Sequence, residues 1–180
     1  NASEDVLKAQ EAFKVQVLTS QNVAHALSHQ EHRIRAEYAR IEQIKNEDEK
    51  AAVQLRFKIV DEALTLRCPR CKVAFVDFDG CYAVNCGNNN CRCDFCAWCL
   101  KDCGKNAHSH VLQCSENPSK KKDYFNTEAA FKQHHTRKRI AAVKQLLHES
   151  SLSQSAVEKL KVLVKRDLAD LHIQLRDVFP

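Results

Sequence analysis

All ten cysteines of the chain lie in one stretch, from Cys68 to Cys114. The same stretch is rich in Asn, Gly and Asp, which favour turns over long helices. A segment this small cannot be stable on an apolar core alone, so cross-links must hold it. The flanking segments are long, charged and helix-forming, and they need no covalent staple. The Cys-x-x-Cys pairs and the nearby histidines therefore favour metal ions, in a compartment that keeps thiols reduced, over disulfides.

Two Cys-x-x-Cys pairs, Cys68/Cys71 and Cys96/Cys99, predict two metal ions. Each such turn places two thiolates on one side of an ion, and two further ligands from elsewhere in the chain complete a tetrahedron. Zinc is the metal that such sites prefer. The ten cysteines, together with His108 and His110, exceed the eight ligands that two closed sites need. Each surplus group is a packing residue, a rival ligand or a nucleophile.

The spacing of these cysteines resembles the Rcat domain, the catalytic zinc domain of RING-between-RING ubiquitin ligases. The shared pattern is Cys-Pro-x-Cys, then nine residues of which the last is Gly, then a cysteine, and then three more cysteines each preceded by four other residues, the last of which begins a Cys-x-x-Cys pair. It is carried by Cys68, Cys71, Cys81, Cys86, Cys91, Cys96 and Cys99. The resemblance covers about 47 residues and does not extend to the flanks.

The resemblance implies that Cys81 is a nucleophile. In Rcat domains the cysteine after glycine accepts ubiquitin from an E2 enzyme as a thioester and passes it to an amine. Gly80 would leave room for an extended ubiquitin tail, and Arg70 or Lys72 could acidify the thiol. The alternative is that Cys81 is inert or completes a zinc site in place of Cys86.

The zinc ligands follow from this assignment, with alternatives open at both sites. The first site takes Cys68, Cys71, Cys86 and Cys91, with Cys93 as a rival to Cys91. The second takes Cys96, Cys99, His110 and Cys114, because ligands separated by three residues are a common zinc spacing. Cys103 with His108 is the alternative to its last two ligands.

The chain departs from the Rcat pattern in three places. Many Rcat domains have a histidine two residues after the catalytic cysteine, where this chain has Ala83. We therefore take His108 as the candidate general base, with a zinc ligand or a surface histidine as the alternatives. Trp98 lies one place later than the tryptophan of the family, and we interpret it as a lid packed over the zinc ligands.

No second cysteine-rich stretch exists, so E2 recruitment would fall to the helices or to other parts of a longer protein. We expect such a protein, since the chain begins with Asn1 and has no Met.

The flanks have helical periodicity. Ser3 is a candidate N-cap for a helix from about Val6 to Leu66, and the polar stretch 46–49 is a candidate break in it. After the cysteines, Thr127 and Glu128 predict a helix start that runs to about His148. A Ser-rich break over 150–155 precedes a last helix with an apolar heptad stripe, for which the N-terminal helices are the expected partner. The stripe consists of Val157, Leu160, Val164, Leu168, Leu171, Leu175 and Val178.

The predicted fold is mostly α, with a small zinc-stabilised β-hairpin module, an Rcat-like two-zinc domain, inserted between long helices. The ranges are a coiled-coil-like region over 1–66, the module over 67–115, a linker over 116–126 and helices over 127–180.

The predicted function is a transthiolating E3 ubiquitin ligase whose partners are ubiquitin, an E2 and a protein substrate. A non-catalytic zinc module that binds ubiquitin, an E2 or another protein is the alternative. Nucleic-acid binding is least favoured, because aromatic residues are only 7% and show no stacking pattern. No apolar run is long enough for a membrane span, and we expect a cytoplasmic or nuclear location.

Overall fold

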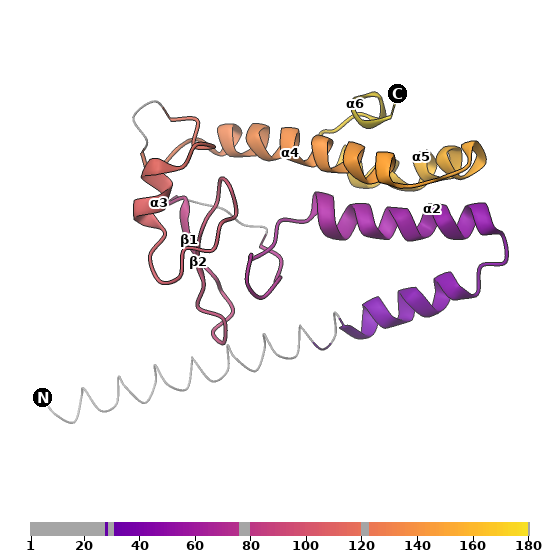
Figure 1. The fold of residues 1–180 in the computed structure, drawn as a ribbon, viewed down its shortest axis with the longest axis horizontal. Helices are drawn as coiled ribbons and strands as arrows, with labels where there is room; N and C mark the ends of the chain where they lie inside the picture. Colours follow the sequence, from indigo (N-terminus) through magenta and orange to yellow (C-terminus); the bar gives the residue numbers. More distant parts are fainter. Residues whose placement is uncertain (1–27, 29–30, 76–79, 120–122, 180) are drawn as a thin grey trace, which may run out of the picture. The chain divides into compact units, whose positions relative to one another are not determined.

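The structure is a computed structural model that describes residues 28, 31–75, 80–119 and 123–179 (Figure 1). The chain divides into two compact units. One contains residues 1–43 with 88–90, and the other contains residues 44–87 and 91–180. In the first unit residues 31–42 are helical. The N-cap at Ser3 and the first 27 residues of the expected coiled-coil-like region lie outside the described residues.

The second unit begins with helix α2, Glu47–Lys58. The Asn46 side chain caps it by accepting a hydrogen bond from the Glu49 N–H at 2.9 Å. Three acidic residues then lie in the first turn, where the positive end of the helix dipole favours them. The expected break therefore lies at 43–46 and not at 46–49, because residues 47–49 form the start of α2. A π-helical turn, η1 (Ile59–Leu64), continues α2 toward the cysteines.

The cysteine-rich segment contains little regular structure. Strands β1 (Ala83–Asn85) and β2 (Asp94–Cys96) pair antiparallel, with Val84 opposite Phe95. A short helix, α3 (His108–Gln113), packs against β2. The small antiparallel sheet expected from the sequence is thus present, within a chain that is otherwise mostly helical.

Helix α4 spans Glu128–Glu149, and the Thr127 side chain caps it by accepting from the Ala130 N–H at 3.2 Å. Both ends agree with the sequence prediction. The serine-rich break is shorter than expected, because Ser153 already caps helix α5, Gln154–Ala169.

The expectation of one last helix through Val178 is wrong. Helix α5 ends at Ala169, and a separate short helix, α6 (Leu175–Val178), follows. His172 adopts a left-handed backbone with φ 57°, and the Ile173 N–H returns to the Leu168 carbonyl at 2.9 Å. This hydrogen bond is the one that closes a Schellman-type helix end. The second half of the heptad stripe therefore folds back instead of extending the seam.

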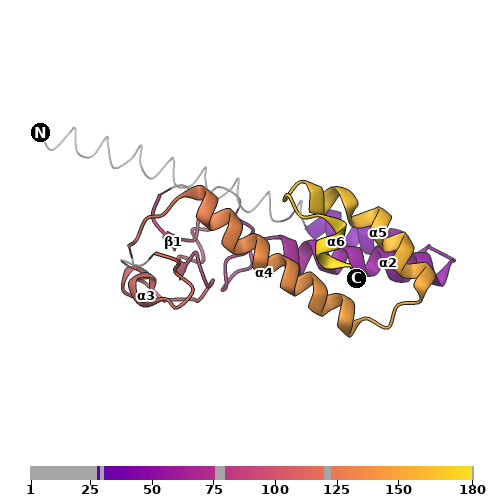
Figure 2. The same cartoon turned by 90° about the horizontal axis from the view of Figure 1, so that it is seen from above.

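Helix α4 runs from the cysteine-rich segment to the other helices (Figures 1 and 2) and contributes side chains to two hydrophobic cores. Its C-terminal half contributes Val143 and Leu146 to a helical core formed with α2, η1, α5 and α6. Its first turns contribute Phe131 to a core in the cysteine-rich segment, beside Tyr82 and Trp98. In that helical core α2 packs against α5, so the partner expected for the C-terminal stripe comes from the predicted N-terminal region. None of the helices in the described ranges has both the length and the apolar character that a bilayer crossing requires.

Candidate metal centres and the Cys81–His108 pair

The first cluster unites the cysteines on both sides of β1. Lys72 takes a left-handed backbone with φ 63°, and its N–H bonds to the Cys68 carbonyl, so the first Cys-x-x-Cys turn closes tightly. Cys86 follows β1, and its N–H donates to the Cys93 carbonyl at 2.8 Å. These contacts bring four sulfur atoms within 4.8 Å of one another, those of Cys68, Cys71, Cys86 and Cys91.

The distances in this cluster fit a metal ion. The Cys71–Cys86 sulfur separation is 3.6 Å and the Cys68–Cys91 separation is 3.8 Å. A tetrahedron with metal–sulfur bonds of about 2.3 Å has sulfur–sulfur edges of about 3.8 Å, whereas a disulfide needs about 2.05 Å. All ten cysteines, which lie in the described part of the chain, are free thiols. The donor set is therefore arranged for a metal and not for disulfides.

The second cluster joins the turn after β2 to helix α3. Leu100 has a left-handed backbone with φ 58°, and its N–H bonds to the Cys96 carbonyl at 2.8 Å. The His110 Nε2 lies 3.2 Å from the Cys99 sulfur. Metal–sulfur and metal–nitrogen bonds in a tetrahedron would separate these atoms by roughly 3.5 Å. The group is Cys96, Cys99, His110 and Cys114, again within 4.8 Å.

Burial disfavours the free thiolate at two ligand positions of the second cluster. It raises the pKa of the Cys96 thiol to about 12 and also raises the pKa of Cys99. At Cys68 burial acts in the same direction, but backbone hydrogen bonds from Cys71 and Arg70 outweigh it and lower the pKa to about 7. Since metal ligands must be deprotonated, a bound cation would supply the charge that stabilises the buried sulfurs.

The structure thus brings together the eight residues chosen as ligands from the sequence, and their rivals lie outside both clusters. The Cys93 thiol is buried and donates to the carbonyl of Asp94 at 3.6 Å. The Cys103 thiol donates to the carbonyl of Lys101 at 3.3 Å. Neither belongs to a cluster, and His108 does not either.

Cys81 and His108, the two candidate catalytic residues, lie side by side. The Cys81 Sγ is 3.6 Å from the His108 Nε2, although 27 positions separate them in the sequence. Cys81 precedes β1 and is partly exposed, and His108 is the exposed first residue of α3. Tyr124 packs edge-on against the His108 ring, with centroids 5.1 Å apart. Cys81 is outside both metal clusters.

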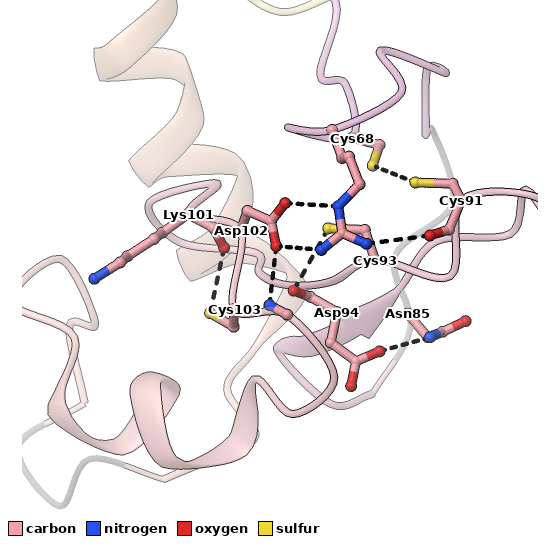
Figure 3. A network of polar contacts seen from close by, with 10 residues as sticks. Cys68, Asn85, Cys91, Cys93, Asp94, Lys101, Asp102 and Cys103 are labelled. Carbon is pink, nitrogen blue, oxygen red and sulfur yellow. Dashed lines mark hydrogen bonds and ion pairs between the residues drawn. The ribbon is translucent and has the colours of Figure 1, made fainter.

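The cations that we expected near Cys81 are engaged elsewhere. The Arg70 guanidinium makes two hydrogen bonds of 2.8 Å to Asp102 and a third to the Cys91 carbonyl, within the network of Figure 3. Its hydrogen bonds hold the pKa of the Asp102 carboxyl well below its usual range. The Lys72 ammonium bonds to the Pro69 carbonyl. Arg70 therefore ties the first Cys-x-x-Cys turn to the loop after β2.

Two histidines of α4, which the sequence analysis did not single out, hold the backbone between Cys96 and Cys99. The His135 Nε2 donates to the Ala97 carbonyl at 2.8 Å, and the His134 Nε2 lies 3.0 Å from the Trp98 carbonyl. Trp98 is fully buried and stacks on Tyr82 at 4.2 Å. Two consecutive histidines in a helix match no known sequence motif. Their contacts with the backbone of residues 97 and 98 could therefore not be predicted from the sequence.

Comparisons of the chain with family models, with curated proteins and with solved structures found no significant match. The two clusters and the Cys81–His108 pair are therefore the features of the molecule that bear on its function.

Proposed function

We propose that this chain is the acyl-transfer part of an E3 ubiquitin ligase, held together by two zinc ions, in which Cys81 carries ubiquitin as a thioester. The observation that carries the proposal is the 3.6 Å contact between the Cys81 thiol and the His108 imidazole. An accessible thiol beside a base, outside the metal sites, is the arrangement of an activated nucleophile.

Zinc is the metal that best fits both clusters. One cluster offers four sulfurs, and the other offers three sulfurs and one imidazole nitrogen. Such closed, thiolate-rich sets suit structural zinc, which takes no open coordination position and has no redox chemistry. Bound zinc would fix the segments on both sides of Cys81, since Cys71 and Cys86 both belong to the first cluster.

The proposal has two transfer steps, and the Cys81–His108 contact supports the role of each residue in them. His108 Nε2 takes the proton of the Cys81 thiol, and the thiolate attacks the carbonyl carbon of the E2–ubiquitin thioester. The carbon–sulfur bond to the E2 breaks, and the departing E2 thiolate takes the proton that His108 holds, which leaves the imidazole neutral again. A substrate amine then attacks the Cys81 thioester, loses a proton to His108 and expels the Cys81 thiolate, which takes that proton back from His108.

The alternative is a non-catalytic zinc module that binds ubiquitin, an E2 or another protein. Such a module needs the two clusters but does not need a thiol next to an imidazole. We place either activity in the cytoplasm or the nucleus, where thiols stay reduced.

Intact-mass analysis separates the two functions. The zinc-loaded chain is incubated with an E2 charged with ubiquitin, and the products are divided between samples with and without a thiol reductant. An adduct of one ubiquitin that disappears on reduction supports the ligase. Absence of this adduct with several E2 enzymes, while ubiquitin or an E2 still co-elutes with the chain, would favour the binding module.

A further inference from the structure

The approach to Cys81 is bordered by a strap, which we define as residues 123–127. Cys81 pairs with Phe125 in an isolated antiparallel bridge, and the Tyr82 N–H donates to the Tyr124 carbonyl at 2.8 Å. The Phe125 ring reaches the residue before the nucleophile, because a Cβ on Gly80 would lie 3.9 Å from the Phe125 Cε1.

The Phe125 side chain is not what holds the strap in place. Three backbone carbonyls do this, since the Asn117 amide donates to Asp123, the Tyr82 N–H to Tyr124 and the Tyr82 hydroxyl to Thr127. The ring itself is 62% exposed, which makes Phe125 one of the few large apolar side chains at the described surface. A ligand that covers a water-exposed phenyl ring beside a nucleophile removes apolar surface from water, and this burial stabilises the complex.

The chemistry of acyl transfer determines what that ligand is. For attack, the carbonyl carbon of the donor must come within about 3.5 Å of the Cys81 sulfur. The chain that leads to this carbonyl then has to pass the groups beside Cys81. Gly80 has no side chain, and the Phe125 ring lies in van der Waals range of the position that a Gly80 Cβ would take, so this ring is an apolar surface available to a chain that reaches Cys81 over Gly80.

We propose that Phe125 is a positioning residue, whose ring packs on the carboxyl-terminal tail of the ubiquitin donor and holds its terminal carbonyl at Cys81. The inference rests on the proposed function. It assigns a role in donor binding to the segment after the cysteine module, which the sequence analysis treated as a linker.

The test uses the whole zinc-loaded chain and ubiquitin whose carboxyl terminus is activated as a small-molecule thioester, so that E2 recruitment plays no part. The rate of adduct formation on Cys81 is measured against ubiquitin concentration, and site-resolved alkylation of Cys81 by iodoacetamide reports the intrinsic reactivity of the thiol. Phe125→Ala should raise the half-saturating ubiquitin concentration roughly tenfold. Alkylation and zinc content should stay unchanged, and Phe125→Tyr should restore most of the binding.

Val162→Ala is the matched control, because Val162 is a 76% exposed apolar residue on α5, and it should behave as the unmodified chain. An unchanged half-saturating concentration in Phe125→Ala would overturn the inference and leave the ligase proposal standing. A parallel loss of alkylation would also overturn it, since Phe125 would then act on the thiol and not on the donor. If the unmodified chain forms no adduct although iodoacetamide labels Cys81, the proposed function fails and the role of Phe125 falls with it.

Discussion

The His135 Nε2 donates a 2.8 Å hydrogen bond to the carbonyl of Ala97, which joins α4 to the turn that carries Cys96 and Cys99. His135 is 1% exposed, so its imidazole has little access to water. Burial lowers the pKa of His135 to about 4, from 6.5, although the hydrogen bond to Ala97 acts in the opposite direction. The imidazole therefore stays neutral in the folded chain at neutral pH.

Acid should weaken the fold through His135. The unfolded chain binds a proton at this residue near pH 6.5, whereas the folded chain resists until about pH 4. This contribution to stability is complete above pH 6.5 and is lost as the pH falls toward 4. We expect a loss of roughly 2–3 kcal/mol in the free energy of unfolding, measured by urea denaturation across this range.

Variants can distinguish the acid destabilisation caused by His135 from that caused by protonation of the metal ligands. His135→Gln keeps a neutral donor and should lessen the acid sensitivity. His148→Gln changes an exposed histidine of the same helix and should leave the acid sensitivity of the stability unchanged. Equal pH profiles for His135→Gln and the unmodified chain would contradict the assigned role.

Cys81 and Cys86 should respond differently to replacement by serine. Cys81→Ser should keep two zinc ions in native mass spectrometry and lose the reducible ubiquitin adduct, because a hydroxyl is a poor thioester acceptor; a more stable ester could accumulate instead. Cys86→Ser should lose one ion, because it removes a ligand from the first cluster. Loss of zinc from Cys81→Ser would show that Cys81 is a ligand.

Variants of His108 and His110, both on α3, should likewise distinguish a general base from a metal ligand. His108→Gln should retain both ions and slow thioester formation about 10²- to 10⁴-fold, which is the range for removal of a general base. Higher pH should recover part of the rate, because hydroxide can then act as the base in place of the imidazole. His110→Gln should release one ion. A His108→Gln chain with an undiminished rate would eliminate the base role.

Chelation of zinc should leave much of the helical signal in circular dichroism. The helical core around Leu160, Val164 and Leu168 includes no cysteine and buries its apolar residues without metal. The cores of the cysteine-rich segment are smaller and include ligand cysteines such as Cys96 and Cys68, and structural zinc contributes on the order of 10–16 kcal/mol of apparent binding free energy to small domains. A collapse of the entire helical signal would mean that the metal sites nucleate the whole fold.

Local signals predicted much of the fold. The hydroxyl of Thr127 caps α4 three residues downstream, so the helix start could be read from neighbouring residues. The same holds for the Cys-x-x-Cys turns, whose ligands are three positions apart. The heptad stripe misled us at Leu171, because periodicity reports which residues are apolar and not whether the backbone between them stays helical.

By itself the sequence therefore predicted helices on both sides of the cysteines and two metal clusters with alternatives for several ligands, whereas the choice of Cys81 among the surplus thiols came from the family resemblance. Tertiary structure decided which of Cys91 and Cys93, and which of the groups between Cys103 and Cys114, join a cluster. It also brought His108 to Cys81, Phe125 to Gly80 and His135 to Ala97. The physical reason is the distance along the chain over which each interaction acts. Helix capping and turn closure involve residues a few positions apart. A ligand set or a thiol–imidazole contact depends instead on how the fold brings together segments that are far apart in the sequence.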